Sequence, residues 1–84
     1  MNSLAFDKEL DARGLLCPLP ILRCKKALAD IQGGQVLKVV ATDPGSVKDF
    51  QAFCKQTGHE MAAFEEQDAV PKKEFIFHIR KRVS

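Results

Sequence analysis

The sequence predicts an α/β fold of the α+β type, a two-layer sandwich with both helices on one face of a mixed four-stranded sheet. Three observations support this class. Strand-like and helical segments follow one another in the order β-α-β-α-β-β, each helical segment has one apolar stripe, and the last strand has an alternating apolar row. A strand–helix–strand unit favours parallel strands joined by a right-handed crossover. The pattern leaves the strand order open.

The first half of the chain contains a strand, a helix and a second strand. Residues 6–12 place apolar side chains at alternate positions, which indicates a strand. Residues 20–32 carry an apolar stripe at helical spacing, and we expect this helix to begin at Pro20 and to end at the glycine pair 33–34. Residues 36–42 form a nearly continuous β-branched run, which is typical of a central strand.

The second helix is predicted over residues 46–57, where apolar side chains again share one face. Asp43 is a candidate cap for this helix, and Pro44 suits its first position, because the N–H of the first helical residue has no intrahelical partner. Gly58 is expected to end the helix.

Two further strands are predicted over residues 59–66 and 74–81, with a polar loop between them. Alternation in the last strand places one set of side chains towards the core and His78 on the opposite face, which we expect to be open to solvent. The inward row consists of Phe75, Phe77 and Ile79.

The size and charge of the chain limit its function. Its 84 residues predict one domain spanning residues 1–84, and a net charge of +2 does not by itself indicate nucleic-acid binding. The first residues include acids and no long apolar run, so no secretory signal is predicted. Since no stretch approaches the ~20 apolar residues of a transmembrane helix, we expect no membrane association and a location in the cytoplasm. A monomer is expected, although the sequence does not fix the oligomeric state.

Three cysteines are present, Cys17, Cys24 and Cys54. An odd number without a C-x-x-C pair suits a reducing compartment better than a disulfide scaffold. Together with His59 and His78 they lack the paired spacing of structural zinc sites, so we expect no metal and no other cofactor. Cys24 and Cys54 lie within the apolar stripes of the two helices and are interpreted as core residues.

Cys17 lies outside those stripes, directly before the first helix. Pro18 and Pro20 restrict the turn, because proline fixes its own φ and excludes the preceding residue from the helical region. A thiol at a helix N-terminus has a lowered pKa and a larger thiolate fraction. Arg13 and Arg23 are candidates to add positive potential. Cys17 is therefore the candidate nucleophile, although the pattern alone also fits a packed turn residue.

The other reactions of a nucleophilic cysteine fit this chain less well. His78 is predicted on the solvent face and His59 at the start of a strand, so neither is an evident base for a protease-like pair. Cys24 follows Cys17 by two helical turns, which is too far for a disulfide whose α-carbons must lie within ~7 Å. The remaining interpretation is a single exposed thiolate that exchanges sulfur with other proteins.

The segments "LDARGLLCPLPIL", "VLKVVATDPGS" and "FCKQTGHE" resemble the TusA/SirA family of small sulfur-carrier proteins, with a match from about Leu10 to Arg82. The family signature C-P-x-P is present over residues 17–20. The resemblance implies a β-α-β-α-β-β sandwich in which Cys17 accepts a sulfane sulfur as a persulfide and passes it on. Leu19 occupies the third motif position, where some family members carry an acid, and this position bears on partner preference.

The resemblance also implies partners. The chain would be a sulfurtransferase that acts as a carrier, with a cysteine desulfurase or another sulfane-sulfur donor on one side. A downstream sulfur-relay acceptor protein would lie on the other. Relatives serve 2-thiouridine synthesis in tRNA, dissimilatory sulfur oxidation, molybdenum-cofactor synthesis or selenium metabolism, and the sequence does not choose among these pathways.

Two alternatives come from other classes. The segment "PKKEFIFHIRKR" combines basic and aromatic residues, so an RNA-binding or regulatory module is conceivable. An edge strand protected by Lys and Arg is favoured, because its phenylalanines alternate inward, and no direct nucleic-acid contact is expected. A redox sensor based on Cys17 fits poorly without a resolving cysteine.

Positive charge is expected around the start of the first helix. Arg13 and Arg23 flank the motif, and Lys25 and Lys26 follow on the polar side of the helix. Such a patch would favour an anionic sulfur and attract an acidic partner surface. Lys72, in the loop before the last strand, is expected to lie away from the motif.

Overall fold

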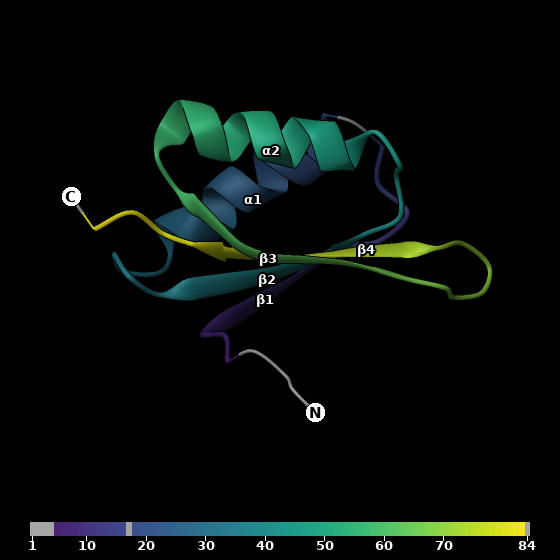
Figure 1. Ribbon diagram of the computed structural model, residues 1–84, viewed down its shortest axis with the longest axis horizontal. Helices are drawn as coiled ribbons and strands as arrows, with labels where there is room; N and C mark the ends of the chain where they lie inside the picture. Colours follow the sequence, from purple (N-terminus) through teal and green to yellow (C-terminus); the bar gives the residue numbers. More distant parts are fainter. Residues whose placement is uncertain (1–4, 17, 84) are drawn as a thin grey trace.

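A computed structural model of the chain describes residues 5–16 and 18–83. Its elements follow the predicted order, and the two helices form one layer over the sheet (Figure 1). The predicted α+β sandwich is therefore confirmed. The elements are β1 (Lys8–Ala12), α1 (Leu19–Ala29), β2 (Val36–Ala41), α2 (Ser46–Thr57), β3 (Glu60–Gln67) and β4 (Glu74–Arg80).

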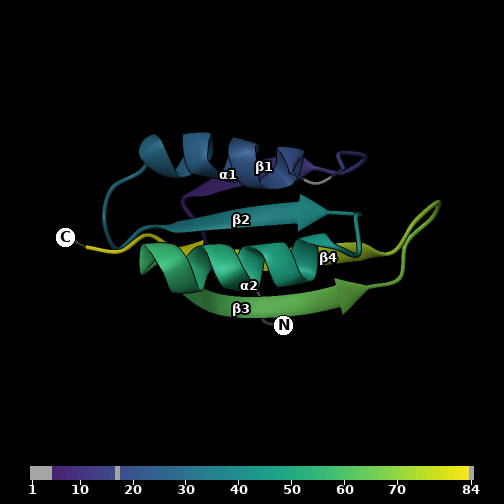
Figure 2. The same cartoon turned by 90° about the horizontal axis from the view of Figure 1, so that it is seen from above.

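The strand order, which the sequence pattern left open, is β1-β2-β4-β3. β1 and β2 are parallel, whereas β4 runs antiparallel to both β2 and β3. The two central strands are the most apolar ones, which is expected because central strands are covered by neighbours on both sides. β4 is one of them, so the expectation that the last strand lies at an edge of the sheet is wrong. Both helices lie on the same face of this sheet (Figure 2).

The start and end of α1 differ from the prediction by a few residues. The helix begins at Leu19, so Pro18 is its N-cap residue and Pro20 lies within its first turn. It ends at Ala29, before the glycine pair, because the N–H groups of the next two residues bond to carbonyls only three residues back and tighten the last turn. Gly34 then adopts a φ of +88° in the turn to β2.

The start of α2 corrects a second expectation. The helix begins at Ser46 with Gly45 as its N-cap residue, so Pro44 is not its first residue and Asp43 is not its cap. The Asp43 carboxylate instead accepts a hydrogen bond from the Gly45 N–H at 3.1 Å and closes the turn before the helix. Gly58 ends α2 with a φ of +83°, as predicted.

The core lies between the helices and the inner face of the sheet. The predicted row of Phe75, Phe77 and Ile79 is buried there, and the Phe77 ring lies 4.5 Å from that of Phe50 on α2. Cys24 and Cys54 belong to the same cluster, which confirms their interpretation as core residues.

The prediction that His78 faces solvent is wrong. His78 does lie on the face without helices, but it is only 9% exposed. The segment before β1 crosses this face, and the Phe6 ring lies 6.3 Å from the imidazole, which is also the cross-strand neighbour of Lys38. The sequence predicts the first strand from residue 6, whereas β1 begins at Lys8. Phe6 therefore belongs to the segment that covers this face.

Candidate functional site

The C-P-x-P loop connects the end of β1 to the start of α1. Because β1 and β2 are parallel and β4 is antiparallel to them, three connections gather at this edge of the sheet (Figure 2, right). They are the C-P-x-P loop, the turn into α2 and the β3–β4 hairpin. Cys17, the predicted nucleophile, lies outside the described residues, whereas its sequence neighbours Leu16 and Pro18 are described.

Gly14 determines how the chain leaves β1. Its φ is +81°, a conformation that residues with a side chain rarely adopt. Its N–H donates to Thr42 Oγ1 at 2.9 Å, and the next N–H, of Leu15, donates to the Ala12 carbonyl at 3.2 Å. These bonds fix the beginning of the loop to the ends of both β1 and β2.

The approach to α1 is a tight turn. The Leu19 N–H donates to the Leu16 carbonyl at 2.9 Å, and the Leu22 N–H donates to the Pro18 carbonyl at 3.1 Å. The Pro20 side chain is fully buried, whereas Pro18 is exposed. One proline of the motif therefore attaches the helix start to the core while the other lies at the surface.

Exposed leucines surround the motif. Leu16 is 66% exposed, Leu19 44% and Leu22 52%. Clustered exposed apolar side chains beside a loop are typical of a protein contact surface, because isolated water-exposed leucines seldom gather in one short segment. We call these three residues the leucine collar.

The predicted supporting arginines have different surroundings. Arg13 bonds to both oxygens of Asp11, with its Nε 2.9 Å from the carboxylate, and its Nη1 lies 3.3 Å from Glu74. Arg13 thereby lowers the pKa of Asp11, and the two carboxylates balance much of its charge. Arg23 is exposed on α1, and none of the ion pairs within the described residues includes it.

A groove of about 850 Å³ lies beside the loop, between the start of α2 and the β3–β4 hairpin. Its apolar lining includes Leu16, Val47 and Phe75. Its charged lining consists of three lysines and two carboxylates: Lys48, Lys72, Lys73, Asp43 and Glu66. Lys72 therefore lies beside the motif, and the expectation that it lies away from it is wrong. Since β4 pairs with β2, the hairpin before β4 must end at the edge where the motif loop begins.

Lys48 is a residue of this groove that sequence reasoning missed. It lies in the first turn of α2, and Lys73, which also lines the groove, pairs with Glu66 at 3.3 Å. The topology could have predicted this position, because helices that follow parallel strands start at the same edge of the sheet. With Lys72, it adds positive charge to the surroundings of the loop.

The two buried thiols are unsuited to surface chemistry. Burial, with a smaller contribution from Cys54, raises the pKa of Cys24 to about 12. Burial also raises the pKa of Cys54. Both groups are therefore protonated near neutral pH, and the protonated thiol is a poor nucleophile.

Within residues 5–16 and 18–83, no three His, Cys, Asp or Glu side chains gather closely enough to hold a metal ion. No helix of the described chain is long and apolar enough to cross a membrane.

His59 lies at the end of the molecule opposite to the C-P-x-P loop, after α2, where its Nδ1 accepts a hydrogen bond from the Arg82 N–H.

The fold and the motif define a small α+β chain with a C-P-x-P sequence between its first strand and its first helix. A family model described as "Sulfurtransferase TusA" matches residues 8–81, and the chain belongs to this family. A sulfur carrier protein TusA from Allochromatium vinosum is 59% identical over 76 residues, which cover 90% of this chain and 95% of that protein.

A more distant relative and a solved structure are similar to the chain as well. A sulfur carrier protein TusA from Pseudomonas syringae is 38% identical over 82 residues, covering 98% of this chain and 93% of that protein. The crystal structure of a SirA-like protein from Desulfitobacterium hafniense superposes with a TM-score of 0.68. It covers 90% of this chain and 100% of its own at 23% identity, which supports the fold.

Proposed function

We propose that this protein is a sulfur carrier that accepts a sulfane sulfur on Cys17 as a persulfide and passes it to an acceptor protein. The observation that carries the proposal is the contrast among the three thiols. Cys17 is flanked in the sequence by the exposed Leu16 and Pro18, whereas Cys24 and Cys54 are buried and protonated.

The reaction is a displacement at sulfur. The Cys17 thiolate attacks the terminal sulfur of a donor persulfide, a new sulfur–sulfur bond forms, and the bond within the donor breaks. The donor thiolate leaves with the electron pair, so no net oxidation occurs and no cofactor is needed on the carrier. Delivery repeats the step, with an acceptor thiolate attacking the terminal sulfur and Cys17 as the leaving group.

The electrostatics of the loop favour an anionic sulfur. The N-terminus of α1 carries partial positive charge, and the first turn of that helix contains no acidic side chain. Arg23, Lys48 and Lys72 add positive charge around the motif. Arg13 has a different role in this proposal: its bonds to Asp11 and Glu74 link the end of β1 to the start of β4 across the intervening β2.

The surface around the motif indicates the kind of partner. The leucine collar offers an apolar contact, and the lysines of the groove favour an acidic rim. A cysteine desulfurase or another persulfide-bearing protein would be the donor, and a sulfur-relay protein the acceptor. We assign the carrier to a reducing compartment such as the cytoplasm and to tRNA 2-thiouridine synthesis or dissimilatory sulfur oxidation.

The RNA-binding alternative has less support. Phe75 and Phe77 are buried under the helices, and stacked bases require exposed rings. Arg80, at the end of β4, lies 2.9 Å from Glu60, which balances part of the basic cluster.

The proposal is tested by loading the protein with polysulfide, or with cysteine and a cysteine desulfurase, and measuring its intact mass. Persulfide formation should add about 32 Da, one sulfur atom. Cys17→Ser should abolish this gain, whereas Cys24→Ala and Cys54→Ala should retain it. Peptide mapping that finds most of the added sulfur on Cys24 or Cys54 would contradict the proposal.

A further inference from the structure

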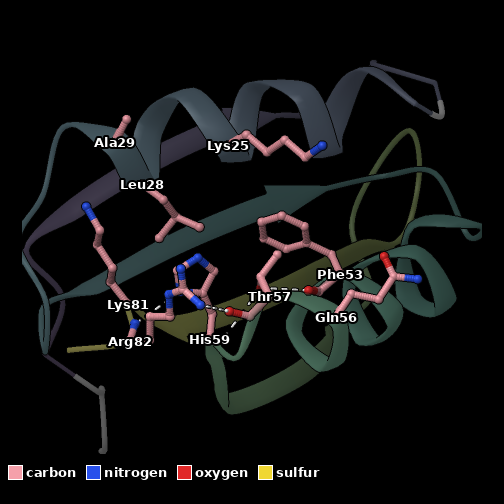
Figure 3. A pocket seen from close by; sticks show the side chains of 9 residues that line it. All are labelled: Lys25, Leu28, Ala29, Phe53, Gln56, Thr57, His59, Lys81 and Arg82. Carbon is pink, nitrogen blue, oxygen red and sulfur yellow. Dashed lines mark hydrogen bonds between the residues drawn. The ribbon is translucent and has the colours of Figure 1, made fainter. Parts of the chain in front are cut away.

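A second groove runs between α1 and α2, on the outer side of the helical layer. It consists of two adjoining hollows of about 490 and 240 Å³ that share Lys25, Phe53 and Gln56 in their lining. The smaller hollow reaches Pro18 at the start of α1. The larger one reaches Arg82 at the other end of the molecule (Figure 3). We call the whole depression the inter-helix groove.

The far end of the inter-helix groove is cationic. Lys81 and Arg82 line the larger hollow at this end, and its lining contains no carboxylate. Lys25 lies where the two hollows adjoin. Lys81 Nζ donates to the Ile31 carbonyl at 2.6 Å, and Arg82 Nη1 donates to the Thr57 carbonyl at 3.0 Å. Backbone carbonyls position these two side chains without neutralising them. Among the described residues, no ion pair includes any of the three cations.

His59 adds a directed donor to this end. Its Nδ1 accepts the backbone N–H of Arg82 at 3.0 Å, so the neutral ring carries its proton on Nε2. Burial and the charges of Arg82 and Lys81 lower the pKa of His59, and the ring is therefore neutral near pH 7. An anion bound beside these cations would offset their effect and raise this pKa.

The groove also has an apolar part. Leu28 projects from α1 and Phe53 from α2 into the space between the helices (Figure 3). Towards the motif, Ile21 and Ala52 continue this lining, and Asp49 is the acidic residue there. Negative charge on a ligand is thus favoured most at the Arg82 end, whose hollow has no carboxylate in its lining, and less beside Asp49.

We propose that the inter-helix groove binds an extended acidic segment of a partner protein. Apolar side chains of the segment would lie between α1 and α2, and its carboxylates would meet Lys81, Arg82 and His59. Charge-assisted bonds from arginine and lysine are the strong contacts for carboxylates, and the apolar lining supplies contact area along the segment. Because the groove begins at Pro18, the body of such a partner would lie beside the C-P-x-P loop.

A peptide fits better than a nucleic acid. A single strand needs exposed aromatic rings for stacking and positive charge along its whole length. Phe53 is only 7% exposed, and Lys81 and Arg82 line one end of the groove whereas Asp49 lines the other, so positive charge does not continue along its whole length. A short segment with apolar residues followed by acids matches this distribution.

The test measures fluorescence anisotropy with a labelled peptide of four apolar residues followed by three glutamates. A second peptide carries glutamines in place of the glutamates. The variant Lys81→Gln/Arg82→Gln should bind the acidic peptide about three- to tenfold more weakly than the wild type, the range expected when two exposed charge contacts are lost. The glutamine peptide should bind weakly to both proteins.

The matched control is Lys26→Gln/Lys55→Gln, which removes the same charge from exposed positions on α1 and α2 outside the groove. This variant should bind like the wild type. Thermal melting checks that each variant is folded, and Lys81→Gln alone keeps the test decisive if the loss of the Arg82 bond unfolds the chain. An NMR titration of His59 should show its pKa rising when the acidic peptide is bound.

Three results would overturn the proposal. The first is equal affinity for the two peptides, and the second is that the groove and control variants weaken binding of the acidic peptide equally. The third is that a single-stranded RNA binds more tightly than the acidic peptide and that the groove variant abolishes this RNA binding. The proposed sulfur chemistry is measured separately by mass. Loss of persulfide formation with intact peptide binding would remove only the carrier function. If the acidic peptide does not bind but persulfide formation is normal, only the proposed role of the inter-helix groove is contradicted.

Discussion

The N–H of Gly14 donates to Thr42 Oγ1 at 2.9 Å, and this bond ties the end of β1 to the end of β2 where the C-P-x-P loop begins. Gly14 has a φ of +81°, and a Cβ added there would meet no atom within 4 Å. The glycine is therefore required by backbone conformation rather than by space. The geometry of the loop depends on this one turn and on the threonine that accepts its N–H.

The first prediction concerns Thr42. Replacing it with valine keeps the shape of the side chain but removes the acceptor of the Gly14 N–H, so Thr42→Val should lower the free energy of unfolding by about 1 kcal/mol. Sulfur loading should also slow, because the loop start loses an anchor. Urea unfolding and the loading rate are the measurements. Thr42→Ser retains the hydroxyl and should preserve both; equal losses in the two variants would show that the bond is unimportant.

The second prediction concerns the buried thiols. Cys24→Ser and Cys54→Ser each place a hydroxyl in an apolar core, and each should cost about 1–3 kcal/mol of stability. Urea midpoints measure this cost. Cys17→Ser is the comparison and should cost much less. If all three variants unfold at the same urea concentration, Cys24 and Cys54 do not contribute to the core as the structure indicates.

The helices and the inner face of the sheet could be predicted because burial has a period. The stripe that contains Cys24 and the row of Phe75 and Phe77 follow from spacing alone, since one face of each element must leave water. The position of Lys72 beside the motif required the strand order, which spacing does not contain. The burial of His78 required knowing that Phe6 lies across the second face of the sheet.

The third prediction concerns the pH dependence of stability. Burial and the charge of Lys38 lower the pKa of His78 from its ordinary value of 6.5, while Glu65 opposes the shift. The folded state therefore binds fewer protons than the unfolded state. His78 should leave stability undiminished above pH 6.5 and should reduce it as the pH falls towards and through the lowered pKa of the folded state.

Urea unfolding at several pH values between 5 and 8 measures this slope. His78→Phe removes the titrating group and retains a ring beside Phe6, so its stability should fall less between pH 7 and pH 5. His59, whose pKa is lowered as well, should supply the slope that remains in this variant. Identical slopes in the wild type and in His78→Phe would contradict the prediction.

The last prediction concerns how a donor protein finds the loop. Lys72 lines the groove beside Leu16, and Arg23 is exposed on the first helix. If these charges attract an acidic partner, Lys72→Glu and Arg23→Glu should slow sulfur transfer from a donor protein. The slowing should be largest at low salt, because the screening length shrinks to ~8 Å near 0.15 M salt.

Lys55→Glu is the matched control, since Lys55 lies in the last turn of α2, away from the edge that carries the loop. It makes the same change in net charge and should leave the transfer rate nearly unaltered. Transfer is followed at several salt concentrations, together with the pKa of Cys17 from its alkylation rate. If Lys72→Glu and Lys55→Glu slow transfer equally, the positive charge beside the C-P-x-P loop does not attract partners. If the pKa of Cys17 changes while the salt dependence does not, these cations act on the sulfur and the partner is recognised through the leucine collar.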